Sequence, residues 1–147
     1  TNSYGPGDNF NDNKNHVIPA LLKRFHLAKK NKLEFVEIWG SGKPLREFLF
    51  VDDLADAIIF LLEKYNDEEI INVGSGQELS ILELAKKIAE CVGYNGQIKL
   101  DLSKPDGAPR KLLSNKRLTS LGWRAKTDIL DGLESTYKWA VENKKII

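Results

Sequence analysis

The sequence contains no methionine, one cysteine and two histidines among its 147 residues. A single cysteine, Cys91, excludes an internal disulfide. One cysteine and two histidines also form no convincing cluster of metal ligands. No apolar run approaches the roughly 20 residues that a membrane-spanning helix needs. An excess of one charge sign is also missing, because 22 Lys and Arg residues face 21 Asp and Glu residues. The sequence therefore predicts no metal site, no membrane span and no nucleic-acid partner.

The first residues read Thr-Asn-Ser-Tyr-Gly-Pro-Gly-Asp, with neither an initiator methionine nor the segments of a signal peptide. We therefore expect a cytoplasmic location, and we expect the chain to be a piece of a longer protein. Its length suits one domain over residues 1–147, with enough residues to bury a core.

Hydrophobic periodicity and turn residues divide the chain into alternating helices and strands, which is typical of an α/β fold. Residues 1–15 and 103–113 are predicted to be loops because they combine Gly and Pro with no hydrophobic period. Helices are predicted at 16–30, 52–65, 81–92, 114–121 and 127–143, and strands at 34–39, 46–51, 70–76 and 97–102.

Several details of the helices are specific enough to test. Ser80 and Glu83 have the spacing of a capping box. Asp52 and Asp53 are expected to cap the second helix and to place negative charge in its first turn. That helix is apolar on nearly every side, so we expect a further layer, a parallel sheet, to cover it. In the last helix, one apolar stripe is predicted to contain Ile129, Leu133, Tyr137 and Val141.

The stretch from Trp39 to Ala57, WGSGKPLREFLFVDDLADA, combines a Gly-rich turn, a strand that begins at Arg46, and a helix. An indole, a free guanidinium and flexible glycines at one turn suit a flat anionic ligand, since Arg binds phosphate with two hydrogen bonds. Taken alone, His16 at a helix start is either a general acid or an exposed residue, and Arg24 is a solvated helix residue. The loop 103–113 is either an exposed charged loop or part of the site, and its charged residues are Lys104, Asp106, Arg110 and Lys111.

Six motifs together are more specific for one family than any of these single features: TNSYGPGDNF, HVIPALLKRFHLAK, WGSGKPLREFLFVDDLADA, INVGSG, SKPDGAPRKLL and LGW. Over essentially all 147 residues the chain resembles the C-terminal half of the GDP-L-fucose synthase family, which are extended short-chain dehydrogenases/reductases. The resemblance implies an NADPH-dependent enzyme that epimerises C3 and C5 of GDP-4-keto-6-deoxy-D-mannose and then reduces its C4 ketone. By resemblance, the acid is His16, the substrate-binding residues are Arg24, Trp39, Arg46, Asp106 and Lys111, and the residues beside NADP are Thr1, Asn2 and Ser3.

The family's Gly-rich cofactor fingerprint, its Tyr-x-x-x-Lys pair and its epimerisation cysteine belong to the N-terminal half. The resemblance therefore implies that this chain holds the substrate-binding part of a Rossmann-type fold and is inactive in isolation. The helices of the family's homodimer also belong to the other half. Cys91 does not match the catalytic cysteine and is interpreted as a small buried residue. Phe50 stands where the family pattern FLHVDD has histidine.

Two other functions remain open from the sequence. One is a different NAD(P)-dependent nucleotide-sugar epimerase or reductase, acting on a UDP-, dTDP- or related GDP-sugar. The other is a nucleotide-sugar binding module without catalysis, which the missing cofactor fingerprint would suit.

Overall fold

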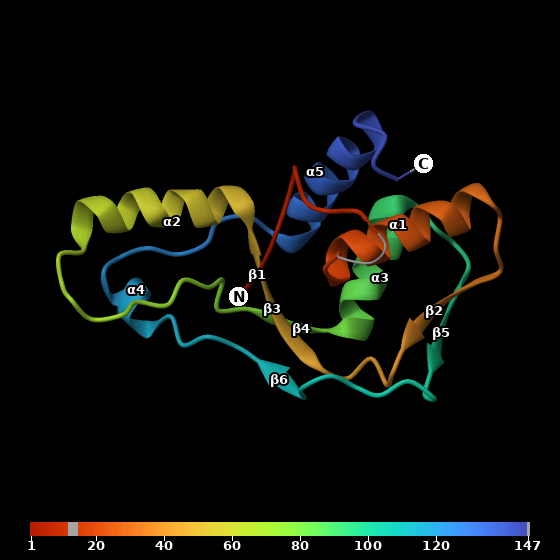
Figure 1. The fold of residues 1–147 in the computed structure, drawn as a ribbon, viewed down its shortest axis with the longest axis horizontal. Coiled ribbons are helices and arrows are strands. Elements are labelled where there is room, and N and C mark those ends of the chain that lie inside the picture. Colours follow the sequence, from red (N-terminus) through yellow and green to blue (C-terminus); the bar gives the residue numbers. More distant parts are fainter. Residues whose placement is uncertain (12–14, 147) are drawn as a thin grey trace.

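The computed structural model describes residues 1–11 and 15–146, and within these ranges the chain forms five helices and six strands (Figure 1). The α/β class expected from the sequence is confirmed. In chain order the elements are β1 Asn2–Tyr4, α1 Val17–Lys30, β2 Phe35–Trp39, β3 Leu45–Phe50, α2 Val51–Lys64, β4 Glu78–Ser80, α3 Ile81–Val92, β5 Gln97–Asp101, β6 Arg110–Lys111, α4 Lys116–Ser120 and α5 Ile129–Glu142.

The larger sheet is built around β3. Strand β1 pairs with β3 in parallel, with Asn2 opposite Phe48, and β6 pairs in parallel with the first two residues of β3. Strand β4 pairs with β3 in the antiparallel direction, with Glu47 opposite Glu78. Strands β2 and β5 form a separate parallel pair. Three segments far apart in the sequence therefore meet at β3.

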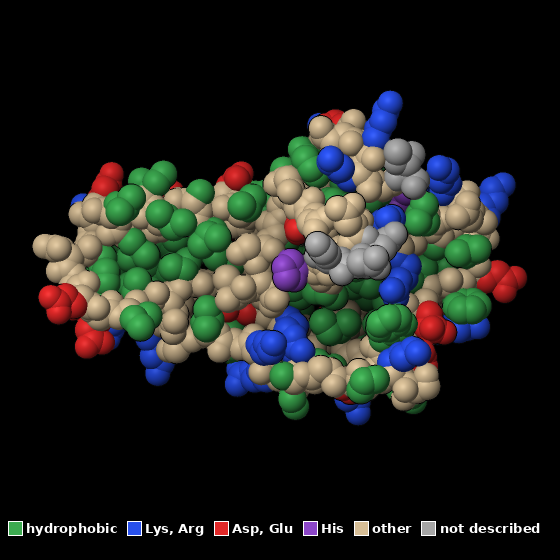
Figure 2. All heavy atoms as spheres, viewed as in Figure 1, with side chains coloured by type: hydrophobic (Ala, Val, Ile, Leu, Met, Phe, Trp, Pro, Cys, Tyr) green, Lys and Arg blue, Asp and Glu red, His purple; other side chains and the backbone are tan. Residues whose placement is uncertain are grey.

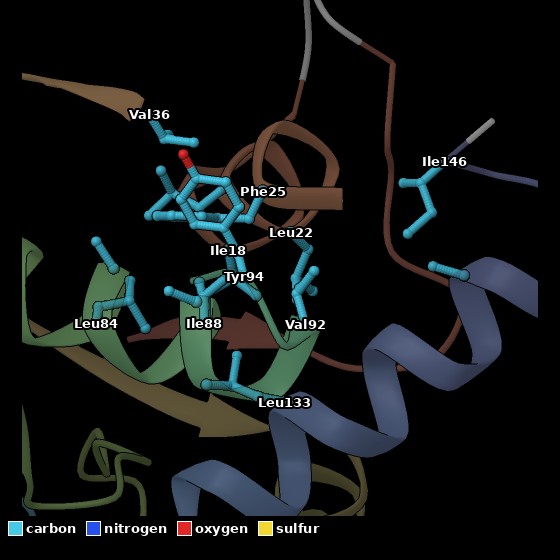
Figure 3. Close-up of a cluster of buried hydrophobic side chains, with 14 of the residues drawn as sticks. Ile18, Leu22, Phe25, Val36, Leu84, Ile88, Val92, Tyr94, Leu133 and Ile146 are labelled. Carbon is cyan, nitrogen blue, oxygen red and sulfur yellow. The ribbon is translucent and has the colours of Figure 1, made fainter. Parts of the chain in front are cut away.

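The main apolar core lies among α1, α3 and α5 (Figure 3). Leu22 and Phe25 of α1 point toward Ile88 of α3, and all three side chains are fully buried. Leu133 of α5 packs from the other side of α3 and is also fully buried. This core holds the β2–β5 pair against the helices, because Val36 of β2 belongs to the same cluster.

A second, smaller core lies beneath α2, in the lobe that also carries α4 (Figure 1). It contains Leu49 of β3, Ala57 of α2, Leu118 of α4 and Trp123. The indole Nε1 of Trp123 donates a hydrogen bond of 2.8 Å to Asp56 Oδ2. Apolar contacts therefore hold this lobe against β3, and the hydrogen bond from the indole of Trp123 holds it against α2.

The expected capping box is confirmed at α3. Helix α3 has a capping box, in which Glu83 N donates to Ser80 Oγ at 3.1 Å and Ser80 N donates to Glu83 Oε2 at 2.8 Å. Gly93 ends this helix in the left-handed conformation, with φ at +71°. Helix α1 accepts Pro19 in its first turn, where a proline removes no intrahelical hydrogen bond.

The two segments predicted as loops each contain a short strand, so these predictions were wrong in part. Asn2–Tyr4 forms β1 and Arg110–Lys111 forms β6. Strands of two or three residues show no period of their own. They exist because β3 offers backbone hydrogen-bond partners from another part of the chain.

The strand predicted at 70–76 is absent from the described sheets, and β4 forms a few residues later at Glu78–Ser80. The apolar residues of 70–76 have another role, since Ile71 and Val73 pack against the second core. The apolar run thus reflects packing of an extended segment and not a place in a sheet.

The predicted cap of α2 was wrong. The helix begins at Val51 after Phe50, whose side chain makes no capping hydrogen bond. Asp52 and Asp53 lie in the first turn, where their charge was expected. Asp53 is buried and its carboxylate accepts hydrogen bonds from the backbone N–H groups of Lys126 and Thr127. It therefore fastens the segment before α5 to the start of α2.

Helix α2 leaves one apolar face exposed, and Figure 2 shows hydrophobic surface running along it. Ile58, Ile59 and Leu62 are 51%, 60% and 81% exposed. The layer expected to cover this face stays a prediction. No helix in the described ranges, α2 included, is long and apolar enough to cross a membrane.

In α5 the predicted apolar stripe holds for its first three members only. Leu133 is fully buried, and Ile129 and Tyr137 pack against the core, but Val141 is 43% exposed. Each step of four residues moves about 40° around a helix, so a fourth member has turned about 120° away from the first.

The partial burial of His26, between α1 and α5, makes the stability of the chain depend on pH. His26 Nδ1 lies 2.9 Å from the hydroxyl of Tyr137. Burial lowers the pKa of His26 below its ordinary value near 6.5, and Lys30 and Lys29 lower this pKa further. The folded chain therefore favours the neutral ring, so its stabilising effect is present above pH 6.5 and is lost as the pH falls below that value.

We expect the free energy of unfolding, measured with urea, to fall between about pH 7.5 and about pH 5.5, and His26→Gln to reduce this fall. His16→Gln removes the exposed histidine and is the matched control, which should keep the fall of the wild type. An equal fall in the His26 variant would show that other groups cause the pH dependence.

Candidate functional site

Trp39 lies at the end of β2 with its indole 62% exposed. Two cations flank it, since the guanidinium carbon of Arg24 lies 5.9 Å and Lys104 Nζ lies 5.7 Å from the ring centroid. Both distances are within the range of a cation–π contact. Arg24 Nη1 also donates a hydrogen bond of 2.7 Å to the carbonyl of Glu37, which holds the guanidinium beside β2. The structure thus brings Arg24 and Trp39 together, as predicted for one site.

Asp106 closes the Gly-rich turn that follows Trp39. Its carboxylate accepts hydrogen bonds from the backbone N–H of Ser41 at 2.8 Å and from the hydroxyl of Ser41 at 2.7 Å. These bonds, with a smaller effect of Lys43, lower the pKa of Asp106 below its ordinary value. Gly40 has φ at +77°, and a Cβ at this position would collide with the Asp106 carboxylate. Glycine is therefore required where the loop 103–109 meets the turn.

Arg46 and Lys111 are direct partners in the parallel pairing of β3 and β6. Arg46 Nη1 donates hydrogen bonds of 2.7 Å to the carbonyls of Leu45 and Ala108. These bonds use one nitrogen of the guanidinium and hold its plane, while Lys111 is exposed beside it. Figure 2 shows Lys and Arg side chains gathered where β4 and β6 lie at the surface. Two like charges in register repel each other, so this arrangement favours an anion between or above them.

Three of the five predicted binding residues, Arg24, Trp39 and Asp106, line two shallow hollows, whereas Arg46 and Lys111 line neither. One, of about 430 Å³, includes Arg24 and Trp39 in its wall. The other, of about 150 Å³, includes Ser41, Lys43 and Asp106. A third hollow of about 220 Å³ lies elsewhere, between β3 and the segment before α5, and includes none of the predicted site residues in its wall. We place the candidate site at the first two hollows, where Arg24 and Trp39 lie, and extend it to Arg46 and Lys111. Arg46 adjoins the second hollow through Ala108, the residue between Gly107 and Pro109 of its wall.

His16 is the residue before α1 and is exposed. Its backbone is extended and its side chain does not cap the helix. Among the described residues, no hydrogen bond or ring contact joins it to Trp39 or Arg46. The structure therefore confirms its place at a helix start and does not test its role as an acid.

Asn2 and Ser3 are the first two residues of β1 and Thr1 precedes them, and Thr1 and Ser3 are exposed. The amide of Asn2 donates a hydrogen bond of 2.9 Å to the backbone carbonyl of Glu47, the residue after Arg46. The segment expected beside the cofactor, which was predicted as a loop and forms β1, is thus bonded directly to the strand that carries Arg46.

Phe50, found where the family pattern has histidine, is buried at the end of β3. Its ring makes an edge-to-face contact with Tyr4, with centroids 5.6 Å apart and an angle of 65° between the rings. An apolar contact between β1 and β3 therefore occupies this position.

Cys91 is half-buried and packs against the main core. Burial raises the pKa of its thiol to about 11, and the carboxylates of Glu134 and Glu90 act in the same direction. A thiol with a raised pKa is a weak nucleophile at neutral pH, which agrees with its interpretation as a structural residue.

Sequence reasoning did not single out Ser41 or Glu47, and it named Lys104 only as one of the charged residues of the loop 103–113. Lys104 lies beside Trp39, Ser41 binds Asp106, and Glu47 is buried behind Arg46. Glu47 could have been noticed in the sequence, because it is the one acidic residue within the mostly apolar strand β3. Nothing in the sequence placed Lys104 beside Trp39 or Ser41 beside Asp106, since each contact joins residues more than 60 positions apart.

Comparison with known sequences gives a consistent result. A family model described as the NAD dependent epimerase/dehydratase family matches residues 1–74. GDP-L-fucose synthase 1 of Arabidopsis thaliana is 54% identical over 143 residues, which are 97% of this chain and 44% of that protein. GDP-L-fucose synthase of Escherichia coli is 49% identical over 153 residues, with 98% of this chain and 48% of that protein covered. The chain thus spans less than half the length of these relatives.

The fold agrees with the sequence comparison. The crystal structure of a GDP-L-fucose synthetase from Naegleria fowleri bound to NADP matches with a TM-score of 0.91 at 33% identity. The match covers 99% of this chain and 46% of that chain. The α/β architecture described above therefore corresponds to part of that structure.

Proposed function

Because this chain belongs to the NAD-dependent epimerase/dehydratase family and is a homologue of GDP-L-fucose synthases, we propose that it supplies the GDP-sugar site of such an enzyme. The proposed reaction is the NADPH-dependent conversion of GDP-4-keto-6-deoxy-D-mannose to GDP-L-fucose. In this proposal the chain is the C-terminal, substrate-binding part of the protein, and it does not catalyse the reaction in isolation.

The observation that carries the proposal is the pairing of Arg46 with Lys111 across neighbouring parallel strands. Two cations held side by side on rigid strands suit the diphosphate of a nucleotide sugar, because a guanidinium and an ammonium can each bind a separate phosphate oxygen. The carbonyl of Ala108 holds the guanidinium in position before any ligand arrives. This reduces the entropy lost on binding.

The surface of Trp39 suits the flat guanine base. An exposed indole offers a stacking plane, and Arg24 and Lys104 beside it attract an electron-rich ligand. Asp106 contributes by holding the Gly-rich turn through Ser41. We assign substrate binding to these residues together with Arg46 and Lys111.

His16 is proposed as the acid of the epimerisation. Removing a proton beside a ketone leaves an enolate, and a second group must return a proton on the opposite face. His16 suits this role because it is exposed and makes no capping bond that would occupy its ring.

The cofactor is proposed to lie beside Thr1, Asn2 and Ser3. The exposed hydroxyls of Thr1 and Ser3 can bind a polar group, whereas Asn2 is already bonded to Glu47. These residues fit one part of a dinucleotide, and the chain contains no G-x-G-x-x-G motif for its diphosphate. When bound, NADPH supplies the hydride for reduction at C4.

Calorimetric titration of the chain with GDP and with UDP tests the proposal. We expect GDP to bind at least about tenfold more tightly than UDP. A base that does not match the site leaves polar groups of the site without hydrogen-bond partners, which weakens its binding. NADPH oxidation with GDP-4-keto-6-deoxy-D-mannose should be absent for the chain alone.

Equal binding of the two nucleotides would favour another nucleotide-sugar enzyme of the family. No binding of GDP would contradict the assignment of the GDP-sugar site to this chain. Turnover by the chain alone would contradict the proposed division between the substrate-binding part and the cofactor-binding part.

A further inference from the structure

Glu47 is a carboxylate within the apolar strand β3 and is only 1% exposed. Its Oε1 accepts a hydrogen bond of 2.8 Å from the backbone N–H of Gly76, and its Oε2 accepts a longer one of 3.4 Å from the N–H of Leu113. Among the described residues, no Lys or Arg forms an ion pair with it. A buried carboxylate is costly, and here backbone N–H groups alone offset that cost.

The bonds of Glu47 join three segments that are distant in the sequence. Its own strand carries Arg46, Gly76 ends the Gly-Ser-Gly turn, and Leu113 follows β6 two residues after Lys111. The strands that carry Arg46 and Lys111 are therefore connected through this one side chain. Moving the carboxylate would move Leu113, and with it Lys111, relative to Arg46.

Close packing leaves the carboxylate little freedom. The nearest glycine, Gly74, has room for no side chain, because a Cβ there would lie 2.5 to 2.8 Å from the carboxylate atoms of Glu47. The backbone carbonyl of Glu47 is also held, by the amide of Asn2. An apolar side chain of similar volume would fill the space at a lower desolvation cost but could not bind the two N–H groups.

We propose that Glu47 is a positioning residue that sets the spacing of Arg46 and Lys111 and thereby the affinity of the site for a nucleoside diphosphate. The inference rests on the proposed function, because it concerns the same site. Glu47 itself lies behind the strand and does not contact the ligand.

Glu47→Gln tests the inference with the smallest change in shape. One of the two N–H groups would then face the NH₂ of the glutamine, since an amide offers only one acceptor atom. We expect the Kd for GDP, measured by calorimetry, to rise about tenfold, because a displaced Lys111 would lose part of its interaction with the diphosphate. Glu63→Gln removes the same charge from an exposed position of α2 and should leave the Kd within about twofold.

Gly74→Ala provides a second route to the same displacement, in case the glutamine variant does not fold. The added methyl group would push against the Glu47 carboxylate while leaving its charge in place. We expect this variant to raise the Kd for GDP in the same direction.

A combined variant separates positioning from a purely structural role. If Glu47 acts through Lys111, then Glu47→Gln should change the Kd for GDP by less than about twofold in a chain that already carries Lys111→Ala. If Glu47 has a purely structural role, Glu47→Gln should lower the midpoint of thermal unfolding in both the wild type and the Lys111→Ala chain. At temperatures well below that midpoint, it should leave the Kd for GDP unchanged. Hydrogen exchange at the N–H groups of Gly76 and Leu113 should also become faster in Glu47→Gln.

The outcomes distinguish the two proposals. GDP binding by the wild type with an equal Kd in folded Glu47→Gln would overturn the positioning role and leave the proposed function standing. Absence of GDP binding by the wild type would overturn the proposed function and, with it, this inference. Unchanged hydrogen exchange at Gly76 and Leu113 would overturn the positioning role whatever the binding result.

Discussion

Arg46→Ala is expected to weaken the binding of GDP to the chain by about 100-fold. Arg46 is half-buried with its guanidinium held by the carbonyls of Leu45 and Ala108, and it is the strand partner of Lys111. The substitution removes the charge of Arg46 together with the hydrogen bonds that its guanidinium can still donate to the ligand. Losing both weakens the binding of GDP more than losing either one. Calorimetric titration with GDP measures the loss.

Two further variants identify the source of this effect. Arg46→Lys keeps the charge but loses the planar fork, and we expect a loss of about tenfold. Arg124→Ala removes an exposed arginine before α5, away from the candidate site, and should leave the Kd for GDP near that of the wild type. Wild-type binding by Arg46→Ala would show that the diphosphate is bound elsewhere on the chain.

The largest effect on stability is expected at Phe25. Phe25→Ala should lower the free energy of unfolding by ~3–5 kcal/mol, because it leaves a cavity in the centre of the main core. The ring is fully buried between α1 and α3 and makes an edge-to-face contact with Tyr94, with centroids 5.4 Å apart (Figure 3). Urea unfolding followed by circular dichroism measures the change.

Phe35→Ala is the matched control, since Phe35 is 41% exposed on β2 and should cost less than about 1 kcal/mol. Phe25→Leu is a milder variant for the case in which the alanine variant is unfolded, with an expected cost of about 1–2 kcal/mol. Equal costs at Phe25 and Phe35 would contradict the assignment of the main core to the interface of α1 and α3.

The helices could be predicted from the sequence because their signals are local. The capping box of Ser80 and Glu83 acts across three residues, and Gly93 ends the helix by its own backbone conformation. The apolar residues of α1 that are buried recur along its whole length, from Ile18 to Ala28, so several residues support the same prediction. The predictions were less accurate where the sequence signal was short, or where a four-residue spacing departed from the helical repeat, as at Val141.

The site could be predicted only as a set of residue types. The motifs named Trp39, Arg46, Asp106 and Lys111, but not which of them are neighbours. In the structure Asp106 binds Ser41 and supports the turn, whereas Lys111 is the partner of Arg46. Lys104 joins Trp39 although its loop shows no pattern that would indicate it.

The sequence alone determined the α/β class, the helices and the family resemblance, since these depend on neighbouring residues and on motifs that can be read in order. The tertiary structure decided that β1 and β6 are strands, because each exists only through hydrogen bonds to β3. It also decided the role of Glu47, whose carboxylate binds backbone groups 29 and 66 positions away. Bonds over such separations form only when the chain has folded, so no local pattern could indicate them.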